Sequence, residues 1–186
     1  MRPTVFVMVK EPRAGRVKTR LGREIGMSQA AWWYRHQTGR LLRQIRDPRW
    51  TLCLAVTPDN ALGSWPRDLP RVPQGRGDLG CRMLRLLAHG PALIVGSDIP
   101  GITRGEISRA LNALKGTDVV IGPADDGGYW AIGSRHPLPK GAFLGVRWST
   151  AHALDDTVKS LRSRQIAYAS TLADVDTAED LARFRF

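Results

Sequence analysis

Short apolar runs alternate with longer amphipathic segments along this chain, and this alternation limits the folds that it can adopt. The clearest runs cover residues 4–9, 51–56, 92–98 and 118–122. Each is continuously apolar along its central residues instead of alternating between polar and apolar residues, which is typical of strands buried on both faces. Strands that alternate with helices in this way predict an α/β fold with a mainly parallel sheet and helices on both faces.

The segments between the runs supply the helices and the remaining strands. Apolar residues at helical spacing predict helices at about 28–45, 79–88, 106–114 and 150–164, and from 178 onward. Ser28 is the expected N-cap of the first of these helices. Two further strands are expected at 128–133 and 166–169, and a short edge strand is expected near Val72.

The chain length of 186 residues fits one domain with one hydrophobic core. No apolar run approaches the roughly 20 residues needed to cross a bilayer, and the first residues acquire charge too quickly for a secretory signal. We therefore expect a single domain over residues 1–186, in the cytoplasm and without a membrane partner. The sequence leaves open whether the chain forms a homodimer.

The net charge of +11 comes from 28 Lys and Arg residues against 17 Asp and Glu residues. Clustered cations bind nucleic acid because they release counterions from the phosphates. Here the cations are scattered, and no block of five consecutive basic residues occurs. Charge alone therefore does not favour a nucleic-acid partner.

A basic loop, KEPRAGRVKTRL, follows the first predicted strand, where ligands of parallel α/β sheets bind. It contains one glycine and five cations: Gly15, Lys10, Arg13, Arg16, Lys18 and Arg20. Cations and free backbone N–H groups beside a strand end suit a polyphosphate. A solvated basic loop would have the same composition, and the Walker pattern GxxxxGK[ST] is absent.

Acidic residues follow two other predicted strands. Asp98 ends the apolar run at 92–98, and Thr103 can cap the next helix, so we favour Asp98 as a Mg²⁺ ligand over a capping role. Asp174 and Asp176 flank one residue, and in an extended segment both carboxylates would face one cation. A capping box of Thr177 and Asp180 would explain those two residues without any metal, but it would leave Asp174 unexplained.

Two glycine-rich segments complete the candidates. PADDGGYW at 123–130 fits a turn that approaches a ligand closely, with aromatic residues walling a substrate, and it fits an Asp-Gly hairpin turn equally well. QGRGDLGCRM at 74–83 precedes a predicted helix whose N-terminus would meet a base or ribose, which is a weak signal by itself.

In this order, these segments and GVRWST at 145–150 resemble a family of GT-A-like transferases of unassigned substrate, the DUF2064 type, often labelled glycosyltransferase-like. That family is related in fold to 2-phospholactate guanylyltransferase and to the molybdenum-cofactor nucleotidyltransferases. The resemblance covers almost the whole chain and implies a single-domain nucleotide-diphospho-sugar transferase fold, which is GT-A and Rossmann-like.

The resemblance also implies roles for particular residues. The first loop, with Lys10 and Gly15, would hold the phosphates of a nucleotide, and Lys18 would be its main cation, assisted by Arg16 or Arg20. Asp98 and Asp176 would bind Mg²⁺, or Mn²⁺ in its place. Nucleotide base and ribose would lie near three residues: Gly77, Asp78 and Gly80. The acceptor would lie near two motifs: Asp126, Gly127, Gly128 and Tyr129, and Trp148, Ser149 and Thr150.

Two departures from the family pattern bear on the reaction. The first loop has Glu11 and Arg13 where small or apolar residues are common in the family, and a DxD motif is replaced by Ser97 and Asp98. Glycosyltransferases of this fold usually carry DxD, whereas nucleotidyltransferases use a single aspartate there and a second acid from elsewhere. The resemblance therefore favours nucleotidyl transfer.

The leading hypothesis is a Mg²⁺-dependent transfer of a nucleotidyl group from a nucleoside triphosphate to a small phosphorylated or hydroxyl acceptor, with release of pyrophosphate. Catalysis would rest on positioning and charge stabilisation by Lys18, Arg16, Arg20 and Asp98. The alternatives are a glycosyltransferase that uses a nucleotide sugar and a non-catalytic nucleotide-binding module.

Overall fold

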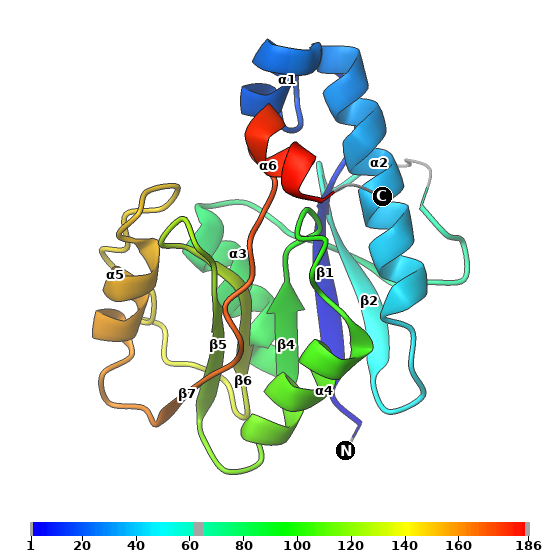
Figure 1. Ribbon diagram of the computed structural model, residues 1–186. Helices are drawn as coiled ribbons and strands as arrows, with labels where there is room; N and C mark the ends of the chain where they lie inside the picture. The colour runs from blue at the N-terminus through cyan, green and yellow to red at the C-terminus, as the bar shows by residue number, and fades with distance from the viewer. Residues whose placement is uncertain (1, 62–64, 185–186) are drawn as a thin grey trace.

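The computed structural model describes residues 2–61 and 65–184. Its seven-stranded sheet has the order β3-β2-β1-β4-β6-β5-β7 (Figure 1). The strands are β1 (Thr4–Lys10), β2 (Thr51–Thr57), β3 (Arg71–Pro73), β4 (Ala92–Val95), β5 (Val119–Pro123), β6 (Tyr129–Ser134) and β7 (Ile166–Tyr168). Neighbouring strands are parallel except for β6, which is antiparallel to both β4 and β5. The mainly parallel sheet and the edge strand at Val72 are confirmed.

Helices pack on both faces of this sheet, as predicted (Figure 1). They are α1 (Thr19–Ile25), α2 (Met27–Gln44), α3 (Leu79–Leu86), α4 (Arg104–Ala113), α5 (Ala153–Ser160) and α6 (Ala178–Arg183), with a short 3₁₀ turn at Leu87–His89. Alternate residues of β1 point to opposite faces. Val5 and Val7 join the core under α2 and α4, whereas Phe6 and Met8 join the core under α3 and α5.

The first helical segment differs from the prediction at its start. Two helices occur there, and the first of them, α1, was not predicted. Ser28 lies inside α2 instead of capping it. Gly26, with φ of 98°, joins the two helices, and its N–H donates to Gly22 O at 3.0 Å. A turn with positive φ suits glycine, so the chain changes direction here without a side-chain cap.

The hairpin interpretation of the segment at 123–130 is confirmed, because β5 and β6 pair antiparallel on either side of it. Two other predicted elements are too long. The strand at 92–98 ends at Val95, since Ser97 turns away to bond Tyr34 of α2. The helix predicted at 150–164 spans only Ala153–Ser160, and before it Thr150 Oγ1 accepts from His152 N at 3.2 Å in a turn.

The predicted caps of the two later helices are confirmed. Thr103 Oγ1 accepts from Glu106 N at the start of α4, and Thr177 and Asp180 form a complete capping box at the start of α6. Both caps satisfy backbone N–H groups that have no partner within the helix.

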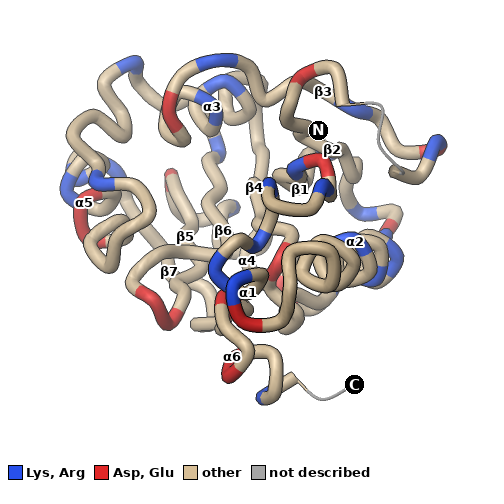
Figure 2. The backbone as a smooth tube through the Cα atoms, turned by 90° about the horizontal axis from the view of Figure 1, so that it is seen from above, with Lys and Arg blue, Asp and Glu red and all other residues tan. Residues whose placement is uncertain are grey.

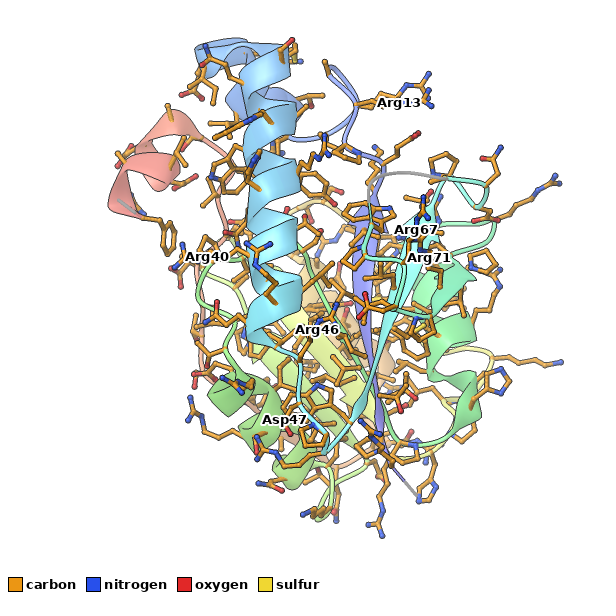
Figure 3. The ribbon with its side chains drawn as sticks, turned by 90° about the vertical axis from the view of Figure 1, so that its right-hand side faces the viewer. Arg13, Arg40, Arg46, Asp47, Arg67 and Arg71 are labelled. Carbon is orange, nitrogen blue, oxygen red and sulfur yellow. The ribbon has the colours of Figure 1, made fainter. Side chains whose placement is uncertain are left out.

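Positive charge is spread over the surface, as the sequence suggests. Figure 3 shows basic side chains at different heights along α2 and the neighbouring loops, among them Arg13, Arg46 and Arg67. Some are paired locally, as Arg46 is with Asp68. Within the described residues, no helix combines the length and the apolar character needed to cross a membrane.

Candidate active site

The site lies at the carboxyl ends of β1 and β4, the two neighbouring strands at the centre of the sheet. β1 leads into the basic loop of residues 11–18, and β4 leads into Gly96, Ser97 and Asp98. Tyr34 of α2 connects the two strand ends. Its hydroxyl accepts a bond from the backbone N–H of Lys10 at 2.9 Å and lies 2.8 Å from Ser97 Oγ. Burial raises the pKa of Tyr34, so the hydroxyl stays protonated and can donate to Ser97.

Lys18 is the most enclosed charged side chain of the site. It is the N-cap of α1, its backbone is left-handed with φ of 45° and ψ of 49°, and its side chain is only 6% exposed. Its Nζ lies 2.6 Å from Asp98 Oδ2, 2.6 Å from Asp176 Oδ1 and 3.9 Å from Asp174 Oδ2. Three carboxylates from two distant segments therefore surround one ammonium group. Asp174 and Asp176 both approach the Lys18 ammonium, whereas their binding of a metal ion stays a prediction.

The charges of this cluster shift the pKa values of its members. Burial by itself lowers the pKa of Lys18, but attraction to Asp98 and Asp176 outweighs burial and raises it above its ordinary value. Burial raises the pKa of Asp174 to about 6, against the lowering effect of Lys18 and with further raising by Asp176 and Asp98. The cluster thus holds more negative charge than Lys18 neutralises. Arg20, 68% exposed, adds a second cation, with Nη1 at 3.1 Å from Asp176 Oδ2.

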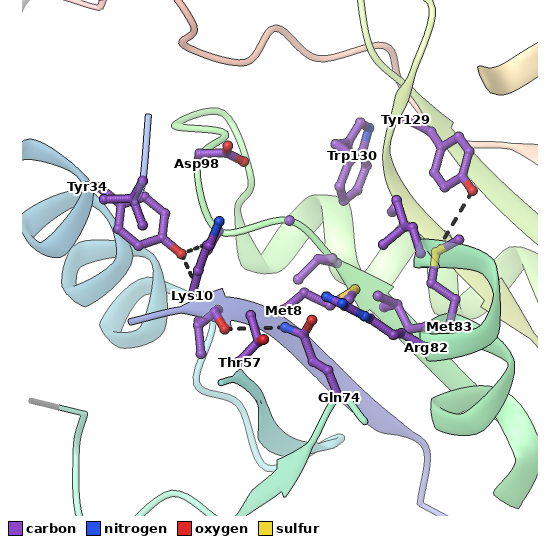
Figure 4. A pocket seen from close by; sticks show the side chains of 18 of the residues that line it. Met8, Lys10, Tyr34, Thr57, Gln74, Arg82, Met83, Asp98, Tyr129 and Trp130 are labelled. Carbon is purple, nitrogen blue, oxygen red and sulfur yellow. Dashed lines mark hydrogen bonds between the residues drawn. The ribbon is translucent and has the colours of Figure 1, made fainter. Parts of the chain in front are cut away.

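Two larger cavities meet at Asp98. The first, of about 660 Å³, is here named the cation-lined cavity, because its charged lining residues are Lys10, Arg16, Lys18 and Arg82 against a single carboxylate, Asp98. Figure 4 shows how Lys10, Asp98 and Arg82 lie around it. The second, of about 500 Å³, is named the carboxylate-lined cavity, and its charged lining residues are Asp98, Asp126, Asp174, Asp176, Lys18 and Arg20.

Lys18 and Asp98 line both cavities. Figure 2, which looks down on this edge of the sheet, shows basic positions at the start of α1 close to acidic positions near α6. An anionic ligand group would be attracted to the first cavity and a cation to the second. The two halves of a reaction could thus be held on either side of Asp98.

A third cavity, of about 230 Å³, lies beside these two and is built by the hairpin turn and the segment at 145–150. Its lining includes Asp98, Asp174 and most of the predicted acceptor residues: Asp126, Gly128, Tyr129, Trp148, Ser149 and Thr150. Asp126 Oδ1 accepts from Gly128 N at 2.9 Å, which shapes the turn. The structure therefore brings these predicted residues together next to Asp98.

Gly127 packs the hairpin turn against the backbone of the segment that leads into α5. It has φ of 82°, and a Cβ atom built on it would lie 2.2 Å from Ala151 O. Its carbonyl oxygen accepts from Leu154 N at 3.0 Å. Only glycine fits such a close approach between two backbones.

The glycine-rich segment before α3 contributes less to the cavities than the first loop does. Asp78 caps α3 by accepting from Cys81 N at 2.8 Å, and a Cβ on Gly80 would lie 2.9 Å from Phe143 Cβ. Among the described residues, the linings of the three cavities leave out Gly77, Asp78 and Gly80, as well as Gly15. The side chains from α3 that line the cation-lined cavity are Leu79, Arg82 and Met83. A direct nucleotide contact by the four residues left out stays a prediction.

Three residues of the site were not singled out from the sequence: Tyr34, Gln74 and Arg82. Gln74, only 3% exposed, donates from Nε2 to Val9 O at 3.2 Å and to Ala55 O at 2.8 Å, which fixes its amide at the wall of the cation-lined cavity. Tyr34 occupies an apolar position of a helix, so its pattern indicates core packing. The available sequence signal for Gln74 was its position directly after the predicted edge strand near Val72, at the start of QGRGDLGCRM.

The acidic cluster has the right donor chemistry for a divalent cation, since hard cations such as Mg²⁺ prefer carboxylate oxygens together with water and phosphate. Across residues 2–61 and 65–184, no three His, Cys, Asp or Glu side chains are already arranged as a set of metal ligands. In the present arrangement the Lys18 ammonium lies between the nearest oxygens of Asp98 and Asp176.

Comparisons with other proteins give one family and several similar structures. The family profile described as "Uncharacterized protein conserved in bacteria (DUF2064)" matches residues 41–150. A crystal structure from Desulfovibrio desulfuricans G20, assigned provisionally by name as a nucleotide-diphospho-sugar transferase, is 32% identical with a TM-score of 0.87. The alignment covers 97% of this chain and 84% of that one.

Two more distant structures share the fold alone. A Mycobacterium tuberculosis H37Rv protein solved in complex with manganese is 17% identical, with a TM-score of 0.53 over 98% of this chain and 97% of that one. A protein from Thermus thermophilus described as a hypothetical transferase is 15% identical, with a TM-score of 0.53 over 97% of this chain and 100% of that one. No curated protein matches the chain.

Proposed function

Because the chain belongs to the DUF2064 family and has the fold of a nucleotide-diphospho-sugar transferase, we propose that it is a metal-dependent nucleotidyltransferase. Its donor is a nucleoside triphosphate and its acceptor is a small hydroxyl or phosphorylated compound. The observation that carries metal-dependent transfer is the meeting of the cation-lined and carboxylate-lined cavities at Asp98. The single Asp98 in place of a DxD motif favours a nucleotidyl donor over a nucleotide sugar. A nucleotidyl transfer needs a basic region that binds the polyanionic donor next to a region that binds the acceptor, because the acceptor oxygen must reach the α-phosphorus.

The cation-lined cavity suits the triphosphate. Lys10, Arg16 and Arg82 surround it, and arginine and lysine bind phosphate oxygens through charge-assisted hydrogen bonds. Arg20 instead pairs with Asp176 on the far side of Asp98. We therefore propose that Arg16 and Lys18 stabilise the negative charge of the departing pyrophosphate, whereas Arg20 pairs with Asp176 from the exposed side.

The acceptor binds beside Asp126, Ser149 and Thr150, which line both the carboxylate-lined cavity and the third cavity. An acceptor oxygen attacks the α-phosphorus, the new O–P bond forms, and the bond from that phosphorus to the bridging oxygen of pyrophosphate breaks. Positioning and charge stabilisation supply most of the catalysis in such transfers. The proton of a hydroxyl acceptor can pass to a neighbouring carboxylate, and Asp126 is the exposed one on that side.

Asp98 and Asp176, with Asp174 beside them, would hold a divalent cation. Three carboxylates against one buried ammonium fit a Mg²⁺ or Mn²⁺ ion in charge and in donor type. Such an ion neutralises charge on the phosphates when it is bound. The manganese in the M. tuberculosis structure belongs to a protein that shares only the fold, so the carboxylates of this chain carry the assignment.

Glycosyl transfer from a nucleotide sugar is the second candidate, and the name of the D. desulfuricans relative favours it. The two reactions differ in the leaving group, because nucleotidyl transfer releases pyrophosphate and glycosyl transfer releases a nucleoside diphosphate. The cavities by themselves accommodate either donor.

The test has two steps. Thermal melting of the purified protein with nucleoside triphosphates and with nucleotide sugars, each with and without Mg²⁺ or Mn²⁺, identifies the donor, since a ligand that binds only the native state raises the melting temperature. Turnover with that donor and a panel of small hydroxyl and phosphorylated acceptors is then followed by phosphorus NMR. We expect pyrophosphate as a product in the wild type and its loss in Asp98→Asn, with Arg183→Gln, an exposed α6 variant, as the matched control. Formation of a nucleoside diphosphate from a nucleotide sugar would instead establish glycosyl transfer.

A further inference from the structure

The position of Lys18 between two carboxylates determines how a metal ion can enter the site. Nζ lies at 2.6 Å from both Asp98 Oδ2 and Asp176 Oδ1, and the side chain is 6% exposed. The ammonium therefore already serves as the cation that these oxygens share. Arg20 differs, because it reaches Asp176 from outside and is 68% exposed.

A divalent ion bound to both oxygens would need nearly the same space. Mg²⁺ binds oxygen at about 2.1 Å, so an ion held by Asp98 and Asp176 would lie close to the present position of the Lys18 nitrogen. Two cations cannot share that space, because their repulsion would be strong in an enclosed site. Either the metal or the ammonium can lie between the two carboxylates.

Lys18 also has a place to go. Lys18 lines the cation-lined cavity as well as the carboxylate-lined cavity, and its Nζ lies 2.6 Å from Asp98, which also lines both. An ammonium that loses its carboxylates and finds no new partner in an enclosed site is costly. Phosphate oxygens in the cation-lined cavity would provide the missing partners.

We propose that Lys18 is an exchangeable counter-ion: a divalent metal displaces it from Asp98 and Asp176, and the phosphates of the ligand receive the released ammonium. This inference rests on the proposed function for the identity of the metal and the phosphate ligand. It adds that metal and phosphate bind cooperatively. The metal releases the ammonium that the phosphate binds, and the phosphate stabilises the ammonium that the metal displaces. Such coupling is reciprocal, so phosphate must raise metal affinity as much as metal raises phosphate affinity.

The experiment measures Mn²⁺ binding to the metal-free protein, by calorimetry and by electron paramagnetic resonance of the free ion, with no nucleotide present. Lys18→Gln removes the competing ammonium and keeps a polar side chain. Arg20→Gln is the matched control, since it removes one positive charge from Asp176 without opening the space between the carboxylates. We expect Lys18→Gln to bind Mn²⁺ at least about tenfold tighter than the wild type, within the usual range of coupling between sites, and Arg20→Gln to change affinity by less than about threefold, as an exposed pair would.

Thermal melting guards against a variant that simply folds poorly. In EDTA, Lys18→Gln should melt below the wild type, because Asp98 and Asp176 then face each other without their shared cation. Added Mn²⁺ should raise its melting temperature more than that of the wild type. The double variant Asp98→Asn with Lys18→Gln should lose this extra gain.

A second arm tests the link to phosphate with inorganic tripolyphosphate in excess Mn²⁺, so that all of the tripolyphosphate carries metal. The melting temperature of the wild type should rise more with Mn²⁺ and tripolyphosphate together than with Mn²⁺ alone. In Lys18→Gln, most of this additional rise should be lost. An equal gain in both proteins would overturn the proposed coupling.

The outcomes separate this inference from the function on which it rests. Equal Mn²⁺ affinity in wild type and Lys18→Gln, with binding lost in Asp98→Asn, would overturn the exchange and leave the metal site standing. An equal rise in affinity in Lys18→Gln and Arg20→Gln would also overturn it, since general electrostatics would then suffice. Failure of every variant to bind Mn²⁺ would overturn both the exchange and the metal-dependent function.

Discussion

The hydroxyl of Tyr34 in α2 lies 2.8 Å from Ser97 Oγ, directly before Asp98 in the chain. The same hydroxyl accepts the backbone N–H of Lys10 at 2.9 Å, at the end of β1. One buried side chain thus connects the two strand ends whose loops carry Lys18 and Asp98. The geometry of the charged cluster therefore depends on a residue outside it.

Replacing Tyr34 with Phe should destabilise the protein by about 1–3 kcal/mol, because the partly buried N–H of Lys10 and the buried hydroxyl of Ser97 lose their partner. Urea unfolding measures this change in the free energy of unfolding. Tyr168→Phe is the matched control, since Tyr168 is 56% exposed and should lose almost nothing. Equal stability of the two variants would show that the Tyr34 hydroxyl does not join the strand ends.

Gly127→Ala should destabilise the protein by more than about 2 kcal/mol, as overpacking combined with an incompatible backbone does. The added Cβ would lie 2.2 Å from Ala151 O, and φ at this residue is 82°. Two variants separate the causes in thermal unfolding. Gly15→Ala has a positive φ of 74° with no atom within 4 Å, and Gly141→Ala also meets no atom within 4 Å. If Gly127→Ala costs no more than Gly15→Ala, the contact with Ala151 is unimportant.

Asp156→Asn should lower the melting temperature at pH 5–7. The difference in melting temperature between the variant and the wild type should become smaller as the pH falls. Bonds from the Arg147 side chain and backbone lower the pKa of Asp156 to about 2. A carboxylate with a lowered folded pKa stabilises the fold above its unfolded value of about 3.9 and loses that contribution as the pH falls through the folded value.

The window for this comparison therefore runs from about pH 4 down to about pH 2. Asp155→Asn, on the same helical turn and exposed, controls for the helix dipole. A difference between wild type and Asp156→Asn that stayed constant down to pH 2 would contradict the ion pair with Arg147.

Asp126→Asn should slow turnover with the identified donor by at least about tenfold if Asp126 receives a proton from a hydroxyl acceptor, since general base catalysis contributes about 10²–10⁴-fold. Its neighbour Asp125 is the control, because it lies outside the linings of the three cavities among the described residues. Steady-state kinetics should show the loss in kcat for Asp126→Asn and little change for Asp125→Asn. Equal kinetics in the two variants would remove Asp126 from the mechanism.

Local sequence patterns determined most of the elements of this protein. Apolar runs predicted the buried strands, because residues covered on both faces must be apolar wherever the chain lies in the sheet. Short-range bonds made the caps at Thr103 and Thr177 predictable as well. The rule that ligands bind at the carboxyl ends of parallel strands then pointed to the segments that contain Lys18, Asp98 and Asp176, and the family resemblance singled out these three residues.

Local pattern was weaker where the backbone turns sharply. The helix α1, the turn at Gly26 and the left-handed Lys18 were not predicted, since each depends on packing of the turn against α2 and α6. The antiparallel placement of β6 was likewise open, because an Asp-Gly turn fits a hairpin and a ligand loop equally well.

The sequence by itself therefore determined the strands, most of the helices and the acidic and basic residues that gather at one edge of the sheet. Tertiary structure alone decided which charges meet. Lys18 and Asp176 are separated by 158 positions along the chain, yet lie 2.6 Å apart at Nζ and Oδ1. The physical reason is that charge interactions depend on distance and burial in space, and both are fixed only when the sheet brings the ends of distant segments together.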